Sequence, residues 1–262
     1  MTSSGPDART TSPTTVFWCD TARDVVEVVG ADAATYLHSQ VSNDLRPLQV
    51  GQSCWAFLLQ PTGKVDVLLR VWRTADDRFV LDTDAGFGEV LVDRVNRFKI
   101  RVKADVAPLS WRCIAVRATD GSPVAGIASL VAWGGGVDLL GAEVEPPAGI
   151  AAGTVEQLLA ARVEAGWPAM GIEIEPGETI PAETGVTSAA VSFTKGCYPG
   201  QELVERMDSR GSIAPRLLQV VDVAPGTSSG DPLLRDGEAI GTVTSVAGGR
   251  ALAYVKRSAL QA

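Results

Sequence analysis

The segment at residues 195–202, Lys-Gly-Cys-Tyr-Pro-Gly-Gln-Glu, constrains the fold more than any other part of this chain. Its two glycines permit backbone conformations that other residues avoid, and Pro199 suits the first turn of a helix. Good helix formers follow, with Leu203 and Met207 four apart on one face. We therefore expect a tight turn that leads into a short helix.

Cys197 is the first candidate functional residue, because this turn places it just before a helix N-terminus. Unpaired N–H groups and the helix dipole favour negative charge there, and Lys195 lies two residues earlier. Both effects favour the thiolate, which is the reactive form of cysteine. The alternative is a small buried cysteine that fills a tight turn, which is a common role of free cysteine.

Length and charge narrow the class of protein. A chain of 262 residues fits one large domain or two to three small modules. The net charge of −8 argues against indiscriminate binding to nucleic acid or to an anionic membrane. The four cysteines form no C-x-x-C pair, so we expect no metal or iron–sulfur site built by this chain alone. Sparse cysteine in a long chain fits a reducing compartment such as the cytoplasm.

The N-terminal stretch does not have the pattern of a signal peptide, and the most apolar stretch does not have that of a membrane span. Residues 1–16 begin with a Ser/Thr/Pro-rich stretch that has no apolar core, which predicts a disordered tail. Residues 123–142 are apolar, but three glycines at 134–136 interrupt them and favour two strands joined by a loop. We therefore expect no membrane partner.

Hydrophobic periodicity predicts an α+β protein. Strands are expected at residues 25–29, 54–59, 65–72 and 79–82, with helices after Asp32 and over residues 87–98. Thr154 and Gln157 form a capping box that opens a helix to about residue 165. Three β-rich runs at 216–223, 240–246 and 251–255 suggest a small C-terminal antiparallel sheet or barrel.

Two charged side chains on predicted elements admit both a functional and a structural interpretation. Strict alternation would place Asp66 with Leu68 and Trp72, away from the valine face of its strand, at a strand end or in a polar pocket. Arg162 falls on the apolar stripe of its helix, where a buried charge needs a partner. That partner is a structural carboxylate or a carboxylate-bearing ligand. The only histidine, His38, is better explained as a structural residue, which disfavours Ser-His-Asp hydrolysis.

The 195–202 segment resembles the signature of the YgfZ-type folate-binding proteins, which are relatives of the T-protein of the glycine cleavage system (GcvT). The Arg-Val-Glu-Ala-Gly segment at 162–166 is similar to the same family, and the resemblance extends from about Phe17 to the end. It implies a GcvT-like fold of several modules around a central channel. It divides the chain into a folate-binding region at 17–208, built of two intertwined α+β modules, and a C-terminal β-barrel at 209–262.

The resemblance implies a protein that binds tetrahydrofolate or a one-carbon derivative and assists assembly or repair of iron–sulfur clusters. Its partners would be iron–sulfur clients, including enzymes of tRNA modification, without direct contact to nucleic acid. Cys197 and Lys195 would supply thiol chemistry, and the implied folate-binding residues are Asp66, Arg162, Glu164, Lys195, Gln201, Glu202 and Arg206. Two alternatives stay open. One is an aminomethyltransferase that moves a one-carbon unit to tetrahydrofolate, and the other is a non-catalytic interaction module.

Overall fold

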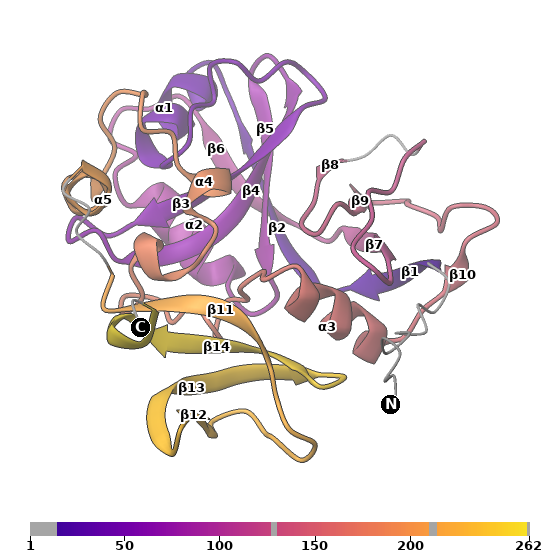
Figure 1. Ribbon diagram of the computed structural model, residues 1–262. Helices are drawn as coiled ribbons and strands as arrows, with labels where there is room; N and C mark the ends of the chain where they lie inside the picture. Colours follow the sequence, from indigo (N-terminus) through magenta and orange to yellow (C-terminus); the bar gives the residue numbers. More distant parts are fainter. Residues whose placement is uncertain (1–14, 127–129, 210–213, 261–262) are drawn as a thin grey trace, which may run out of the picture.

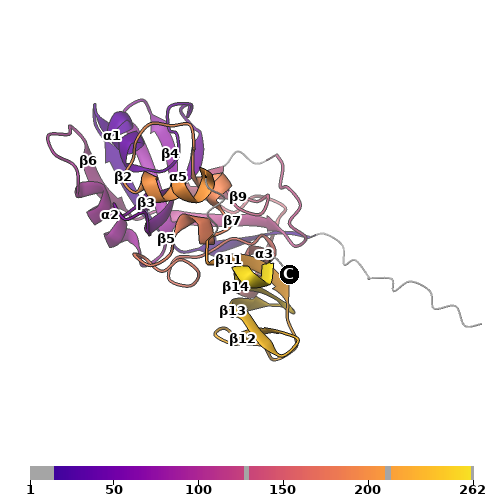
Figure 2. The same ribbon diagram turned by 60° about the vertical axis from the view of Figure 1, so that its left-hand side comes forward.

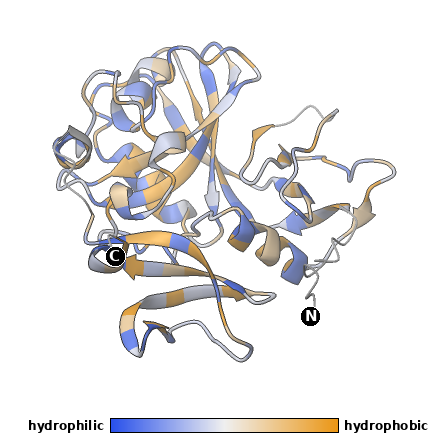
Figure 3. Cartoon of the chain, viewed as in Figure 1, coloured by the Kyte–Doolittle hydropathy of each residue, from blue (hydrophilic) through white to orange (hydrophobic). Residues whose placement is uncertain are grey.

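The computed structural model describes residues 15–126, 130–209 and 214–260, and its strands form three sheets (Figure 1). The first sheet has the order β3-β4-β5-β2-β6 and is antiparallel throughout. Its strands are β2 (Arg23–Val29), β3 (Ser53–Leu59), β4 (Val65–Ala75), β5 (Arg78–Asp84) and β6 (Asp105–Leu109). The mostly apolar, buried runs of β3 and β4 make these strands the centre of the core (Figure 3).

Helices cover one face of the first sheet. Leu37 of α1 (Ala33–Gln40) and Leu91 and Val95 of α2 (Gly88–Asn96) pack against valines and leucines of β2, β3 and β4. The other face is covered by a segment that follows much later in the chain. This segment contains η1 (Pro181–Glu183), α4 (Thr187–Ala190) and α5 (Gln201–Ser209). Burial on both faces explains why β3 and β4 are mostly hydrophobic, although β3 is an edge strand of the sheet.

The second sheet has the order β10-β1-β7-β9-β8. It contains β1 (Val16–Thr21), β7 (Arg112–Ala118), β8 (Leu130–Val131), β9 (Val137–Gly141) and β10 (Ala151–Ala152). Strands β1 and β2 are separated by a single residue, so the chain crosses from this sheet into the first one at once. Strand β10 lies at the edge of this sheet and pairs in parallel with β1.

The third sheet is C-terminal and antiparallel, in the order β11-β14-β13-β12, and lies below the other two (Figure 2). It contains β11 (Arg216–Asp222), β12 (Pro232–Arg235), β13 (Glu238–Ala247) and β14 (Arg250–Lys256), followed by α6 (Arg257–Leu260). Helix α3 (Val155–Glu164) joins it to the body, because Val163 packs against Leu218, Leu252 and Tyr254. Strand β12 was not predicted, and the three β-rich runs correspond to β11, β13 and β14.

The predicted strands and helices are confirmed in type, and the capping box of Thr154 and Gln157 is present. The predicted tail, residues 1–16, lies outside the described residues except for its end, where Val16 begins β1. Asp32 occupies the N-cap of α1, but its carboxylate accepts from the backbone N–H of Lys103 instead of capping the helix. Across the described residues, each helix falls short of the length and hydrophobicity needed to span a bilayer.

Two predicted buried faces, one on β4 and one on α3, differ from those in the structure. The pairing of β3 with β4 shifts register at Leu58 and Leu59, which places Val65 with Leu68 and separates it from Val67 and Leu69. On α3 the expected buried stripe is only partly buried, since Val155 is 69% exposed while Leu159 and Arg162 are half-buried, and Val163 is the buried residue of that helix.

Candidate functional site

The cysteine segment is fastened to the first sheet by its lysine. The Lys195 ammonium is buried and donates to the carbonyl oxygens of His38 (2.5 Å), Val41 (2.5 Å) and Asn43 (3.2 Å). These carbonyls belong to the last turn of α1 and to the residues that follow it, where a helix lacks internal partners. A cation is favoured there by the helix dipole as well.

The second glycine of the segment is required by close packing. Gly200 has φ +83°, and a Cβ at this position would lie 2.5 Å from the Gln60 carbonyl oxygen and 3.0 Å from the Gly63 Cα. Gly63 in turn has φ +86° and faces the Leu203 side chain. The two glycines thus let the start of α5 rest directly on the turn between β3 and β4.

Cys197 lies between these two attachments with its side chain exposed. All four thiols are free, but Cys19 and Cys113 are buried and Cys54 is half-buried. Burial raises the pKa of both Cys54 and Cys113 to about 12, which keeps those two thiols protonated and unreactive at neutral pH. Cys197 is therefore the thiol that a large partner can reach, and it does not fill the turn.

A cavity of about 250 Å³ lies where the first two sheets meet α3 and the loop at residues 167–172. Its charged and aromatic lining consists of Arg23, Arg117, Arg162, Asp84, Asp138, Trp133 and Trp167. The Trp167 ring packs at a tilt of 52° against the ring of the buried Trp55, with the ring centres 4.8 Å apart. Aromatic faces beside a few fixed polar groups are typical of a small-molecule site.

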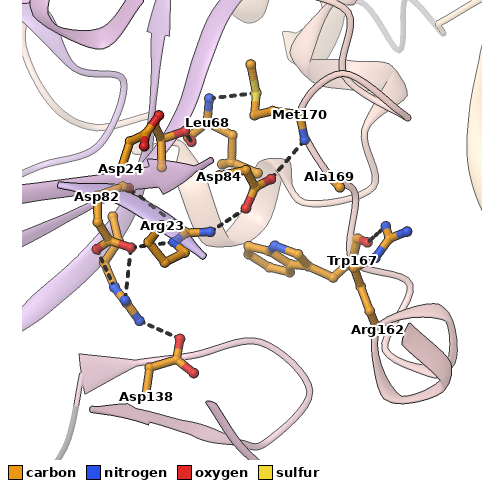
Figure 4. Close-up of polar contacts among 12 residues, drawn as sticks. Arg23, Asp24, Leu68, Asp82, Asp84, Asp138, Arg162, Trp167, Ala169 and Met170 are labelled. Carbon is orange, nitrogen blue, oxygen red and sulfur yellow. Dashed lines mark hydrogen bonds and ion pairs between the residues drawn. The ribbon is translucent and has the colours of Figure 1, made fainter. Parts of the chain in front are cut away.

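A network of ion pairs connects the two sheets at the cavity (Figure 4). Arg23 bonds to both Asp82 and Asp84, and the Asp84 carboxylate also accepts from the backbone N–H of Met170 at 2.9 Å. Behind them the fully buried Arg70 pairs with Asp82 at 2.9 Å and with Asp138 at 2.7 Å. Burial alone would raise the pKa of Asp138, but Arg117 and Arg70 outweigh it and lower that pKa, so this carboxylate stays charged.

Arg117 is a lining residue with unused hydrogen-bonding capacity, as is Asp138, whose Oδ1 accepts no hydrogen bond among the described residues. The Arg117 guanidinium lies 3.9 Å from the centre of the Trp133 ring, 2.8 Å from Asp138, and donates to the carbonyls of Val116 and Val137. Its Nε is buried without a hydrogen-bond partner among the described residues. A Cβ at Gly136 would come within 2.4 Å of the Arg117 Cδ, so this glycine makes room for the arginine. Sequence analysis missed Arg117, although the three glycines at 134–136 and charges inside apolar strands were available signals.

Arg162 lines the same cavity and also holds the C-terminal sheet in place. It donates to Glu173 at 2.8 Å, to the Trp167 carbonyl at 2.9 Å and to the Ser245 hydroxyl at 2.7 Å. The Ser245 hydroxyl donates onward to Glu173, which is 1% exposed. The carboxylate partner that the sequence demanded is therefore present within the protein, while the arginine still faces the cavity.

The remaining candidate residues lie elsewhere. Asp66 accepts from Gln60 at 2.8 Å and pairs with Arg94 at 3.3 Å, and it lines a separate surface cavity beside α2. Glu164 faces Arg250 at 3.5 Å on the surface. On α5 the side chains of Glu202 and Arg206 are exposed, and the Gln201 amide donates to Glu205 at 2.5 Å. The structure thus places Arg162 at the cavity, Asp66 near α2, and the cysteine segment on a third surface.

Comparisons with known proteins agree with this architecture. Residues 216–262 match the family described as "CAF17, C-terminal beta-barrel domain". The chain is similar over 93% of its length to the glycine cleavage system aminomethyltransferase T of Bartonella henselae, with a TM-score of 0.67 and 20% identity, and it covers 79% of that structure. The similarity to this solved structure establishes the fold.

Three curated relatives are similar to this chain in sequence. An uncharacterized Haemophilus influenzae protein is 28% identical over 73% of this chain and 68% of its own length. The human iron–sulfur cluster assembly factor IBA57 is 27% identical over 79% of this chain and 67% of its own length. The Mycosarcoma maydis homologue of IBA57 is 28% identical over 78% of this chain, which spans little more than half, 57%, of that relative. These similarities show a fold like that of the glycine-cleavage T-protein and a C-terminal sheet like that of the CAF17 family, in a chain whose sequence is similar to iron–sulfur cluster assembly factors.

Proposed function

We propose that this protein is an accessory factor in iron–sulfur cluster assembly that binds a reduced folate in the cavity beside Arg117 and presents Cys197 on its surface. The assembly role is supported by the relatives of that name. The folate component is supported by one feature of the structure, the buried and unpaired Nε of Arg117 between Trp133 and Asp138.

The lining of the cavity fits the chemistry of a folate. A flat heteroaromatic ring has faces that stack on the indoles of Trp133 and Trp167. Its polar edge offers acceptors to Arg117 and donors to carboxylates such as Asp84. Because Arg162 and Arg23 already pair with carboxylates, the cavity favours a ligand that is largely neutral where it is enclosed. When bound, a reduced folate would accept or supply a one-carbon unit.

A thermal-shift titration with tetrahydrofolate tests the ligand. A ligand that binds only the native state at 100 times its Kd stabilises it by about 2.7 kcal/mol, which is readily measured as a higher Tm. We expect that shift for the native chain. An unchanged Tm at millimolar tetrahydrofolate would contradict folate binding and favour the interaction-module alternative. Turnover with a lipoylated carrier protein would instead assign the aminomethyltransferase alternative.

The role of the thiol is tested in cells that lack this protein. Expression of the native chain should restore the activity of iron–sulfur enzymes, and Cys197→Ala should not. Cys54→Ala is the matched control, because Cys54 is half-buried and its thiol is protonated at neutral pH. Full restoration by Cys197→Ala would exclude a function for this thiol, while failure of the native chain would contradict the assembly role itself.

A further inference from the structure

Lys195 has no donor to spare for Cys197. A lysine ammonium has three N–H groups, and the three carbonyl oxygens of His38, Val41 and Asn43 accept them. The ammonium also lies 5.0 Å from the centre of the Tyr198 ring, which closes a further side. Lys195 is 5% exposed, whereas Cys197 is exposed. Direct stabilisation of the thiolate by a hydrogen bond from Lys195 is therefore not what this geometry provides.

Two of the three acceptors of Lys195, Val41 and Asn43, belong to a turn that contacts several segments. The Ser42 hydroxyl donates to the Ala190 carbonyl, and the Ser42 carbonyl accepts from the N–H of Ser192 at 3.0 Å. The Asn43 amide donates to carbonyls of Trp55 and Ala189. This turn, residues 41–43, thus joins α1, β3 and the chain that leads into the cysteine segment.

We infer that Lys195 is a positioning residue, whose ammonium holds the 195–200 turn against the end of α1 and thereby fixes where Cys197 stands on the surface. The inference rests on the proposed function of Cys197 as the working thiol. On one side of Cys197 the attachment is Lys195, and on the other it is the contact of Gly200 with the Gln60 carbonyl and Gly63. When the backbone is fixed on both sides of Cys197, the sulfur keeps one position on the surface. Less conformational entropy is then lost when a large partner binds.

The test uses Lys195→Met, which keeps the length of the side chain but leaves three carbonyls unpaired. Lys99→Met is the matched control, because Lys99 also donates to a backbone carbonyl, that of Ala104, far from Cys197 in the sequence. A nitroxide label on Cys197, in a Cys54→Ser background, reports the mobility of the thiol. Amide hydrogen exchange at Ser42 and Ser192 reports whether the segments stay docked.

We expect Lys195→Met to mobilise the label and to accelerate exchange at Ser192 about tenfold or more, since hydrogen bonds to charged groups are the stronger kind. Lys99→Met should leave both readouts as in the native chain. An unchanged label spectrum and unchanged exchange in Lys195→Met would refute the inference. An upward move of the pH midpoint for alkylation of Cys197, without added mobility, would also refute it and assign Lys195 to activation of the thiol.

A second variant covers the case in which Lys195→Met does not fold. Lys195→Arg keeps the charge but cannot direct three N–H groups from one nitrogen, so it should mobilise the label partially. A native spectrum in Lys195→Arg would then count against the inference. None of these readouts needs folate or a cluster, so their failure concerns Lys195 alone and leaves the proposed function to its own tests.

Discussion

The contact between Gly200 and Gly63 yields the sharpest prediction about how the cysteine segment is built. Gly200→Ala would place a methyl group 2.5 Å from the Gln60 carbonyl oxygen and 2.9 Å from the Leu59 Cβ. Both neighbours belong to the buried sheet or to its turn, so neither can move aside cheaply. The residue also has φ +83°, which L side chains rarely adopt.

The expected magnitude has two parts. The left-handed conformation costs a non-glycine residue about 1–2 kcal/mol. Overpacking of a well-packed site adds about 1–3 kcal/mol. Together they predict a loss of about 2–5 kcal/mol, which is a large share of the roughly 5–15 kcal/mol that stabilises a typical domain.

Gly226→Ala separates these two parts. Gly226 has φ +89°, and a Cβ there would meet no atom within 4 Å. This variant should show only the conformational cost of about 1–2 kcal/mol. Urea unfolding followed by tryptophan fluorescence measures both variants against the native chain. Equal losses for the two would refute the argument that the close approach at Gly200 requires glycine.

Three further predictions follow from the buried charges and the thiols. Asp138→Asn should lower the free energy of unfolding in urea by about 3–5 kcal/mol, because it removes a buried carboxylate partner from both Arg70 and Arg117. Asp20→Asn is the control, because it weakens only an exposed pair with Arg112 and should cost at most about 1 kcal/mol in the same assay. Burial lowers the pKa of Lys195 to about 8, against the attraction of Asp44, whereas an unfolded lysine titrates near pH 10.4. Between these two pH values the unfolded chain therefore binds more protons than the folded chain. The urea concentration at half-unfolding should be higher at pH 10 than at pH 8 in the native chain, relative to Lys195→Met. A lower concentration at pH 10 would contradict the shifted titration. Iodoacetamide at pH 8 should label Cys197 rapidly in the folded chain and all four cysteines after unfolding, as counted by mass spectrometry, and rapid labelling of Cys113 in the folded chain would contradict its burial.

Local patterns predicted the elements of this fold well. The alternating strands, the helix at 87–98 and the capping box of Thr154 are all determined by neighbours along the chain, and such signals are visible in sequence. The turn and helix of the cysteine segment were also predictable, because the backbone conformations that glycine and proline favour are local properties of the chain.

The site depended on contacts that local patterns do not contain. Asp66 was assigned to a face by strict alternation, and one register shift between β3 and β4 places it beside Arg94 instead. The hydrogen-bond acceptors that the described residues offer to Lys195 lie more than 150 residues earlier in the sequence. The Arg117 Nε is buried without a hydrogen-bond partner at the place where the guanidinium packs on Trp133, a contact that local patterns do not predict.

The central claim, that the cavity beside Arg117 binds a reduced folate, is tested most directly by equilibrium titration of tetrahydrofolate against indole fluorescence. Trp133 and Trp167 line the cavity, so binding should quench them in the native chain. Arg117→Gln removes the donor that the ligand would use, and Arg112→Gln on the same strand is the control, because Arg112 pairs with Asp20 on the surface. We predict saturable quenching in the native chain and in Arg112→Gln, with the Kd at least about tenfold weaker in Arg117→Gln, as for loss of a buried donor. Absence of saturable quenching in the native chain, or equal affinity in Arg117→Gln with an unchanged fold, would contradict the claim.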